Sequence, residues 1–369
     1  MRVPYAYLSE QFADVEPYID DLRGLVASGE FTIGPYVEAF ERKFADHIGV
    51  KHAIGTNTGT DALILALKAI GAGPGDEVIT VPNTFIATVG AIVAAGATPV
   101  FVDSDERYQI DVSLIAAAIT PRTRAIVPVH WAGCPSDIES VLEIADRHGI
   151  AVVEDACPSV GAQVNGRSVG TFGRVNGFSM HPLKPLNVWG DGGIVVTNDD
   201  EAANFLHLYR NHGLSDRNHI DLWGVNARLQ PVQAIVASRQ LDVVDEIADV
   251  RIRNARRLDQ GLRDLKEYVK IPERPSGYRE VYQLYQVGVA RRDELVSYLE
   301  AQRIEAKVHY PIPLHLQKAA MSLGYKRGDF PVCERQANEI ITLPAHQHIT
   351  TEQVDHVIGA IHSFYGANL

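Results

Sequence analysis

The chain has 369 residues, of which 46% are apolar and 22% are charged. This composition is ordinary for a soluble globular protein, and the length is sufficient for two domains. The net charge of -12 argues against nucleic acid or an anionic membrane as a partner, because both attract basic surfaces.

The cysteines and the apolar segments indicate the compartment. Cys134, Cys157 and Cys333 are odd in number and lack the spacing of metal ligands, which suits a reducing compartment and predicts no metal site. The start of the chain lacks the apolar core of a signal peptide. The most apolar run, residues 89–102, is too short to span a bilayer. We therefore expect a cytoplasmic protein that binds no membrane.

Residues 1–50 show helical spacing of apolar positions after a short extended start, and a loop at residues 28–35 divides them into two helices. From residue 51 to 200, short apolar runs alternate with segments of helical length. Apolar strands separated by helices predict an α/β fold with a mostly parallel sheet and helices on both faces. The expected strands are residues 77–81, 98–103, 125–130, 151–155, 177–180 and 194–197.

The pattern changes in the second half of the chain. Residues 201–260 favour long helices, and the stretch at 241–253 is expected to connect two domains. Shorter mixed elements follow after residue 260. We predict a large domain over residues 1–248 and a smaller α+β domain over residues 249–369.

Lys184 lies in a polar, glycine-rich segment between two predicted strands. Ser179 and His181 precede it, and Gly190–Gly193 follow it. A buried amine has a lowered pKa, because burial disfavours its charged form, and it then attacks carbonyl groups. Most lysines are simply solvated, but these neighbours favour a reactive amine at the edge of the sheet.

A glycine- and threonine-rich turn precedes the predicted helix at residues 59–67. The free N–H groups of its first turn, with the hydroxyl of Thr58 or Thr60, would form an anion site suited to a phosphate. The alternative is a simple N-cap by Thr60.

Two further residues follow predicted strands. Asp155 ends the apolar run at 151–155, where a carboxylate is costly unless it is paired. It could hold a protonated ring nitrogen, or it could be an ordinary capping or salt-bridged Asp. Phe85 follows the strand at 77–81 and could stack on a flat ring, although taken alone it favours a core position.

A phosphate turn, an aromatic residue, an Asp at a strand end, a Ser and a Lys together favour pyridoxal phosphate (PLP) as the cofactor. The sequence resembles the DegT/StrS family of PLP-dependent sugar aminotransferases, which have the aspartate-aminotransferase-like fold, PLP fold type I. The resemblance covers nearly the whole chain. It includes Gly34-Pro35, Phe40-Glu41, Gly59 to Ala62, Glu154 to Ala156, Phe178-Ser179, Lys184, Gly190 to Gly193, Arg210 to Gly213, Gly224 to Arg228, His309 to Pro311 and Leu314 to Gln317.

The resemblance implies a role for each matched residue. Lys184 binds the cofactor covalently and moves protons, and Asp155 pairs with the pyridinium nitrogen, so both are catalytic. The remaining cofactor contacts are expected at Thr58, Gly59, Thr60, Phe85, Ser179 and Asn226. Asn226 is expected to reach the phosphate of a neighbouring subunit, which implies a homodimer with shared active sites. The substrate contacts are expected at His181, Arg228, His309, Tyr310 and His315.

The implied reaction moves an amino group from L-glutamate to a keto- or aldehydo-sugar in amino-sugar, cell-surface polysaccharide or natural-product biosynthesis. Family substrates are mostly nucleotide-linked keto-sugars. The strings at residues 181–189 and 3–8 look more like the branch that aminates a free octulosonate sugar acid.

Two positions depart from the family pattern, and two alternatives stay open. Pro158 stands where the family usually has a Gln that contacts the phenolic oxygen of the cofactor, and Pro185 stands where Asn is common. A PLP-dependent sugar dehydratase would share the fold, but its family has His in place of Lys184. A non-catalytic regulatory homologue is the other alternative.

Overall fold

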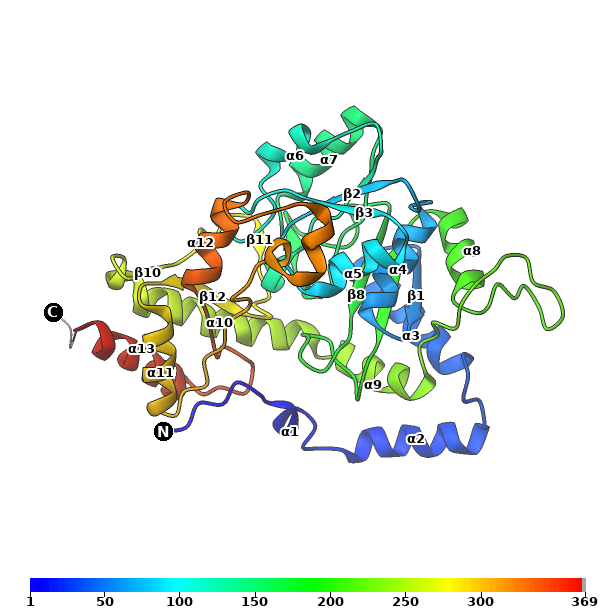
Figure 1. Ribbon diagram of the computed structural model, residues 1–369. Helices are drawn as coiled ribbons and strands as arrows, with labels where there is room; N and C mark the ends of the chain where they lie inside the picture. The colour runs from blue at the N-terminus through cyan, green and yellow to red at the C-terminus, as the bar shows by residue number, and fades with distance from the viewer. Residues whose placement is uncertain (367–369) are drawn as a thin grey trace.

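The computed structural model describes residues 1–366 and places a mixed sheet at the centre of the larger part of the molecule (Figure 1). Four strands pair in parallel in the order β3-β2-β4-β5, and three pair antiparallel in the order β1-β9-β8. Parallel bridges from Asp155 to Val129 and Gly177 join the two groups. The strands are β1 (His52–Thr56), β2 (Glu77–Thr80), β3 (Thr98–Phe101), β4 (Thr123–Ile126), β5 (Ala151–Val152), β8 (Val175–Ser179) and β9 (Gly193–Thr197).

Only β9 among these strands runs against its neighbours, so the predicted mostly parallel sheet is confirmed. All six expected strands are present, but β1 was not predicted. The strands expected at 125–130 and 151–155 end earlier, at Ile126 and Val152. Beyond those points the two segments are joined by a single isolated bridge between Val129 and Asp155.

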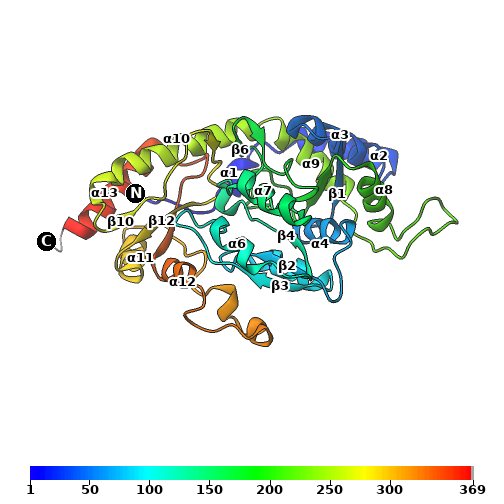
Figure 2. The same ribbon diagram turned by 90° about the horizontal axis from the view of Figure 1, so that it is seen from above.

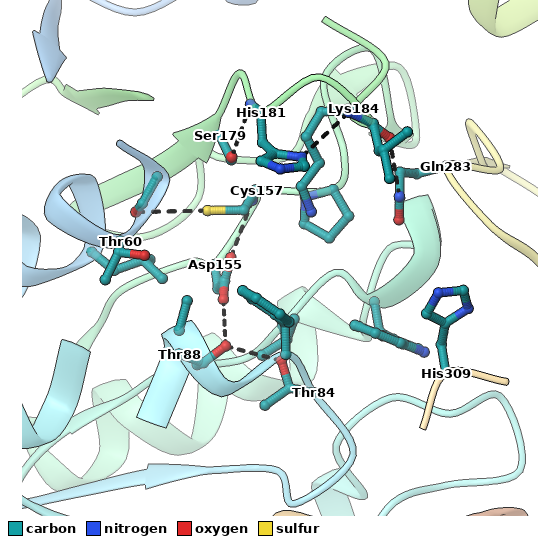
Figure 3. Close-up of a pocket in the computed structure, with 18 of the residues that line it drawn as sticks. Thr60, Thr84, Thr88, Asp155, Cys157, Ser179, His181, Lys184, Gln283 and His309 are labelled. Atoms are coloured by element: carbon teal, nitrogen blue, oxygen red, sulfur yellow. Dashed lines mark hydrogen bonds between the residues drawn. The ribbon is translucent and has the colours of Figure 1, made fainter. Parts of the chain in front are cut away.

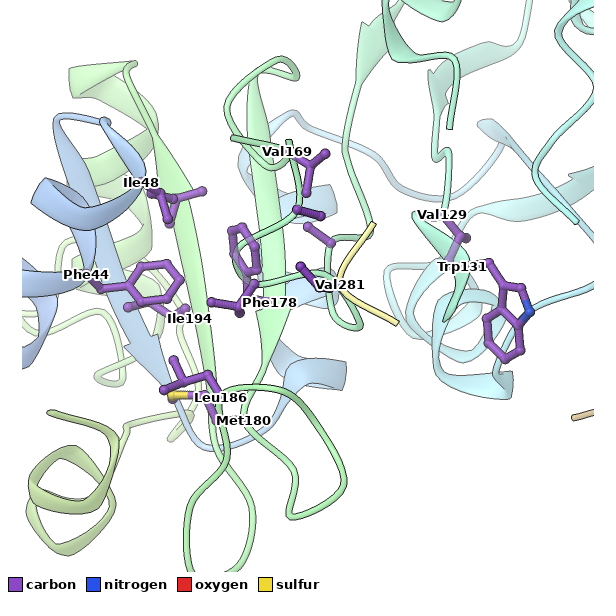
Figure 4. Close-up of a cluster of buried hydrophobic side chains, with 14 of the residues drawn as sticks. Phe44, Ile48, Val129, Trp131, Val169, Phe178, Met180, Leu186, Ile194 and Val281 are labelled. Atoms are coloured by element: carbon purple, nitrogen blue, oxygen red, sulfur yellow. The ribbon is translucent and has the colours of Figure 1, made fainter. Parts of the chain in front are cut away.

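Helices cover both faces of this sheet, as predicted. Successive residues of β9 point to opposite faces, so Ile194 and Val196 enter one apolar cluster and Val195 enters the other. The first cluster includes Phe44, which packs edge-on against Phe178 with ring centroids 5.3 Å apart (Figure 4). The helices on that face are α3 (Pro35–Ile48), α6 (Val112–Ala118), α7 (Ile138–His148) and α9 (Pro231–Leu241), and those on the other are α4 (Gly59–Ala69), α5 (Ile86–Ala94) and α8 (Asp200–Tyr209).

The long helix α10 (Val244–Leu262) runs from the sheet domain to the C-terminal part (Figure 2). Val244 and Ala248 belong to the first apolar cluster, whereas Leu258 and Leu262 belong to a separate C-terminal cluster. The change of packing partner lies close to the predicted boundary at 248/249, although the division into domains stays a prediction.

The C-terminal part consists of a small antiparallel sheet with helices packed on it. Its sheet order is β10-β12-β13, and Val3 near the start of the chain pairs with Ile304 and is buried in the same cluster. The elements are β10 (Val269–Lys270), β12 (Tyr285–Val289), α11 (Arg292–Ala301), α12 (Pro331–Glu339), β13 (Ile340–Leu343) and α13 (Thr351–Gly366).

The remaining elements are short or peripheral. The segment between α8 and α9 projects away from the body of the molecule (Figure 1). None of the helices within residues 1–366 has both the length and the apolar composition needed to cross a bilayer. The peripheral elements are α1 (Leu8–Gln11), α2 (Glu16–Ser28), β6 (Gln163–Val164), β7 (Arg167–Ser168) and β11 (Tyr278–Arg279).

Candidate active site

A cavity of about 370 Å³ lies beyond the carboxyl ends of the central strands, where open α/β sheets bind their ligands. Figure 3 shows side chains from several separate segments around this one space. Ten of the thirteen predicted site residues line it, namely Thr58, Gly59, Thr60, Phe85, Asp155, Ser179, His181, Lys184, His309 and Tyr310.

Lys184 lies on the loop between β8 and β9, and the backbone of this loop is held in place. The Lys184 N–H donates to the carbonyl of His181 at 2.8 Å, and the Gln283 side chain donates to the carbonyl of Leu183 at 3.2 Å (Figure 3). Burial lowers the pKa of the Lys184 amine, and the nearby Cys157 and Asp155 oppose this effect only in part. The amine is therefore more readily neutral and nucleophilic than that of a solvated lysine.

Asp155 is oriented by two hydrogen bonds. The Thr88 hydroxyl donates to one carboxylate oxygen at 2.7 Å, and the Cys157 N–H donates to the other at 3.1 Å. Thr84 in turn contacts Thr88 at 2.9 Å (Figure 3). These bonds hold a buried carboxylate in the cavity wall, where it can face a cationic ring nitrogen.

The start of α4, where the anion site is predicted, borders the cavity. The cap is Thr58 rather than Thr60, because the Thr58 hydroxyl accepts the N–H of Asp61 at 2.9 Å. Thr60 is therefore available to a ligand. A Cβ at Gly59 would lie 2.5 Å from the Cβ of Ser179, so a glycine is required for the helix to approach β8 this closely. The N–H groups of the first turn and the Ser179 hydroxyl consequently border the same space.

The opposite wall of the cavity is aromatic and uncharged. Phe85 is 50% exposed, and its ring lies 6.3 Å from that of Tyr310. Burial lowers the pKa of His309 to about 4 and raises that of Tyr310 to about 12, so both side chains are neutral at pH 7. The pKa of His181 is also lowered by burial and by the adjacent Lys184.

Three predicted residues do not reach this cavity within the single chain. His315 is 2% exposed and contacts Glu334 at 3.1 Å instead. Arg228 donates to the side chain of Asn211 at 3.1 Å. Asn226 is exposed on the projecting segment between α8 and α9.

Sequence reasoning missed several residues that the fold brings to the cavity. Thr84 and Thr88 lie in the same short segment as Phe85, but only tertiary contact joins them to Asp155. Tyr5, Trp131 and Gln283 also line the cavity. Tyr5 lies in the string at residues 3–8 that resembles one branch of the family, but nothing in that string indicated a place in the cavity.

Glu154, the residue before Asp155, has hydrogen-bond partners on both of its carboxylate oxygens. One carboxylate oxygen of Glu154 accepts the N–H groups of Phe172 at 2.7 Å and Gly173 at 2.6 Å. The other accepts the N–H of Gly170 at 2.7 Å and contacts His130 Nε2 at 2.8 Å. The side chains of Glu154 and His130 are fully buried, so Glu154 fixes the backbone that presents Asp155.

Comparison with known proteins decides the family. Residues 14–362 match the DegT/DnrJ/EryC1/StrS aminotransferase family. The chain belongs to this family. The structure of DesV from S. venezuelae, solved in complex with a ketimine intermediate, superposes with a TM-score of 0.96 at 38% identity and 98% coverage of both chains. The predicted family and PLP fold type I are thus confirmed.

Two curated relatives match over nearly their whole length. The dTDP-3-amino-3,4,6-trideoxy-alpha-D-glucose transaminase of Streptomyces venezuelae is 39% identical, with 98% of this chain and 95% of the relative covered. A "pleiotropic regulatory protein" of Geobacillus stearothermophilus is 40% identical, with 99% of both chains covered. The present protein is accordingly a PLP-dependent aminotransferase.

The residues of the cavity fit that cofactor. The close approach at Gly59 forms a cradle of N–H donors for a phosphate, Asp155 offers an oriented carboxylate, and Lys184 offers an amine of lowered pKa. Pro158 also lines the cavity. Because its side chain has no donor, it cannot make the hydrogen bond that Gln makes elsewhere in the family.

Proposed function

We propose that the protein aminates a nucleotide-linked keto-sugar with L-glutamate as the donor, and that its active sites are shared within a homodimer. The observation that carries this proposal is the convergence of Lys184, Asp155 and the start of α4 on one cavity. When bound, pyridoxal phosphate supplies an electrophilic carbon that takes up amino groups and a ring that acts as an electron sink.

Each residue has a defined task in this reaction. Lys184 holds the cofactor, removes a proton from the carbon that bears the amino group, and returns it as the amine is transferred. Asp155 keeps the ring nitrogen protonated. The hydroxyls of Thr60 and Ser179 bind the phosphate, and Phe85 packs on the ring.

Within a single chain, the space beside Lys184 suits an uncharged sugar ring better than a free sugar acid, and the diphosphate of a nucleotide-linked sugar would lie outside this space. Among the cavity-lining residues that the structure describes, Lys184 is the only lysine or arginine, and it is committed to the cofactor. The pKa of His309 is about 4, so this side chain does not supply a cation at pH 7. The chain by itself thus offers an octulosonate carboxylate no permanent positive partner.

The second subunit completes the site in this proposal. Asn226 is exposed in the segment between α8 and α9, where it pairs with Asn211, and it does not line the cavity of its own chain. Arg228 lies two residues further on the same segment. Asn226 would bind the phosphate in the partner, and Arg228 would supply the cation that a glutamate carboxylate requires.

A half-reaction screen tests the proposal. The pyridoxamine form of the enzyme is mixed with dTDP-, UDP- and GDP-linked keto-hexoses and with the free aldehydo-octulosonate, and the return of the yellow colour is followed. We expect a nucleotide-linked sugar to react fastest. Preference for the octulosonate would reject the neutral-sugar proposal, and failure of L-glutamate to regenerate the pyridoxamine form would reject the donor.

The alternatives make different predictions for the same material. A dehydratase lacks the lysine that Lys184 provides, and it would release no amino sugar. A regulatory homologue, suggested by the name of the Geobacillus relative, requires no reactive amine. The lowered pKa of Lys184 beside Asp155 supports catalysis over that role.

A further inference from the structure

The first seven residues form a strap that brings Tyr5 into the cavity from the C-terminal part of the molecule. Val3 is buried, and its carbonyl accepts the N–H of Glu305 at 3.0 Å. The Tyr5 N–H donates to the side chain of Glu305 at 3.1 Å. The ring of His346 contacts the carbonyl of Pro4 at 3.0 Å. The backbone on the N-terminal side of Tyr5 is therefore anchored to two separate segments.

The side chain of Tyr5 is fixed by packing, but its hydroxyl has no hydrogen-bond partner within the part of the chain that the structure describes. The ring stacks on His309 with centroids 6.0 Å apart and planes inclined by 29°. Burial raises the pKa of the Tyr5 phenol, so it is neutral at pH 7. Among residues 1–366 no group is hydrogen-bonded to its hydroxyl, although the residue lines the same cavity as Lys184.

Tyr7, two residues along the same strap, differs in this respect. It is 4% exposed, lies outside the cavity, and its hydroxyl accepts a hydrogen bond from Arg251 at 2.6 Å. Two phenols of one strap thus have different partners: one is satisfied by the protein, and the other faces the ligand space. A polar group held by packing but left unbonded in a cavity is typical of a group that orients a ligand.

We propose that Tyr5 determines specificity for the sugar: its hydroxyl hydrogen-bonds an oxygen of the sugar ring, and its aromatic face packs against the apolar C–H groups of that ring. This inference rests on the proposed function, because it assumes a keto-sugar in the cavity. A neutral phenol both donates and accepts, so it suits the hydroxyl groups of a neutral sugar.

The test compares Tyr5→Phe with Tyr7→Phe in the holoenzyme. Each variant is assayed separately with L-glutamate and with a panel of dTDP-, UDP- and GDP-linked amino-hexoses, which run the sugar half-reaction in reverse. Because one hydrogen bond to the ligand is lost, Tyr5→Phe should lower kcat/KM for the amino sugar by about tenfold. The glutamate half-reaction and the thermal midpoint should stay at the wild-type values.

The control should show the opposite pattern. Tyr7→Phe removes a buried partner of Arg251, so it should lower the thermal midpoint and leave both half-reactions unchanged. Equal losses in both half-reactions of Tyr5→Phe, or no loss in either, would overturn the role of Tyr5. If the wild-type enzyme converts none of the amino sugars, the proposed function fails instead, and the two failures are thereby distinguished.

Discussion

At the scale of single residues, the chemistry depends on how burial changes Lys184. Its pKa is lowered by desolvation, so the amine is more readily neutral and nucleophilic than that of a solvated lysine. We predict that borohydride reduction of the yellow enzyme places the pyridoxyl label on the peptide containing Lys184, as peptide mapping by mass spectrometry would show. Label on another lysine would contradict this assignment. Lys184→Ala should still bind the cofactor but lose transamination.

The carboxylate of Asp155 is expected to act on the ring nitrogen of the cofactor, whereas Lys184 acts on the carbon that bears the amino group. If it keeps the ring nitrogen of the cofactor protonated, Asp155→Asn should slow proton removal by orders of magnitude while the thermal midpoint changes little. Thr88→Val, which removes the hydroxyl at 2.7 Å from this carboxylate, should reduce activity less. Stopped-flow measurement of the L-glutamate half-reaction compares the two variants. Turnover close to that of the wild type in Asp155→Asn would show that the residue is structural.

Buried histidines make the fold sensitive to acid. Burial lowers the pKa of His346 to about 4 from its ordinary value of 6.5. Between these values the unfolded chain binds a proton that the folded chain does not, so the stability contributed by neutral His346 is lost as the pH falls from about 6.5 to about 4. His346→Gln should weaken the dependence of the thermal midpoint on pH over this interval. A slope equal to that of the wild type would rule out this contribution.

At the scale of elements, the proposed phosphate site depends on how closely α4 approaches β8. A Cβ at Gly59 would lie 2.5 Å from Ser179, so Gly59→Ala must displace the start of the helix. We expect this variant to bind PLP more weakly and to lose about 1–3 kcal/mol of unfolding free energy. Absorbance titration and denaturant unfolding measure the two effects.

A glycine within α5 provides the matched control. A Cβ at Gly90 would meet no heavy atom within 4 Å, so Gly90→Ala should leave PLP affinity unchanged and raise stability by about 0.5–1 kcal/mol. If Gly59→Ala binds PLP as tightly as Gly90→Ala does, the start of α4 is not the phosphate site.

At the scale of the whole molecule, the projecting segment determines whether one chain is sufficient. Asn226 is exposed there, and the nearby Trp223 is 89% exposed, as expected for a surface that meets a second subunit. We predict that mixing two inactive variants, Lys184→Ala and Asn226→Asp, restores activity. In the mixed dimer one site carries both changes and the other carries neither, so one site works.

The mixing experiment needs two controls. Asn226→Asp must be inactive alone, because its carboxylate repels the phosphate, and labelled subunits must be shown to exchange. With both conditions met, a mixture without activity would mean that Asn226 serves its own chain, and the shared site would be rejected.

Local patterns in the sequence were sufficient for the α/β class and for several residues that the structure brings to the cavity. Apolar runs separated by helical segments predicted the sheet, because strands buried on both faces must be apolar along their length. Glycine-rich turns and polar residues at strand ends predicted Thr58, Gly59, Asp155 and Lys184, since parallel strands bring their carboxyl ends to one edge. The strand β1 has the sequence His-Ala-Ile-Gly-Thr, which is not a continuous apolar run, so this pattern did not indicate it.

Tertiary structure alone decided which distant residues complete the site. Tyr5 reaches the cavity because Val3 packs in the C-terminal cluster with Ile304, and no short motif encodes a contact over that separation. The same holds for the ion pair of Glu41 and Arg210, which is buried beside β1. Hydrogen bonds and apolar contacts between remote segments form only once the chain has folded, so the place of Tyr5 in the cavity is visible in the structure and not in the sequence.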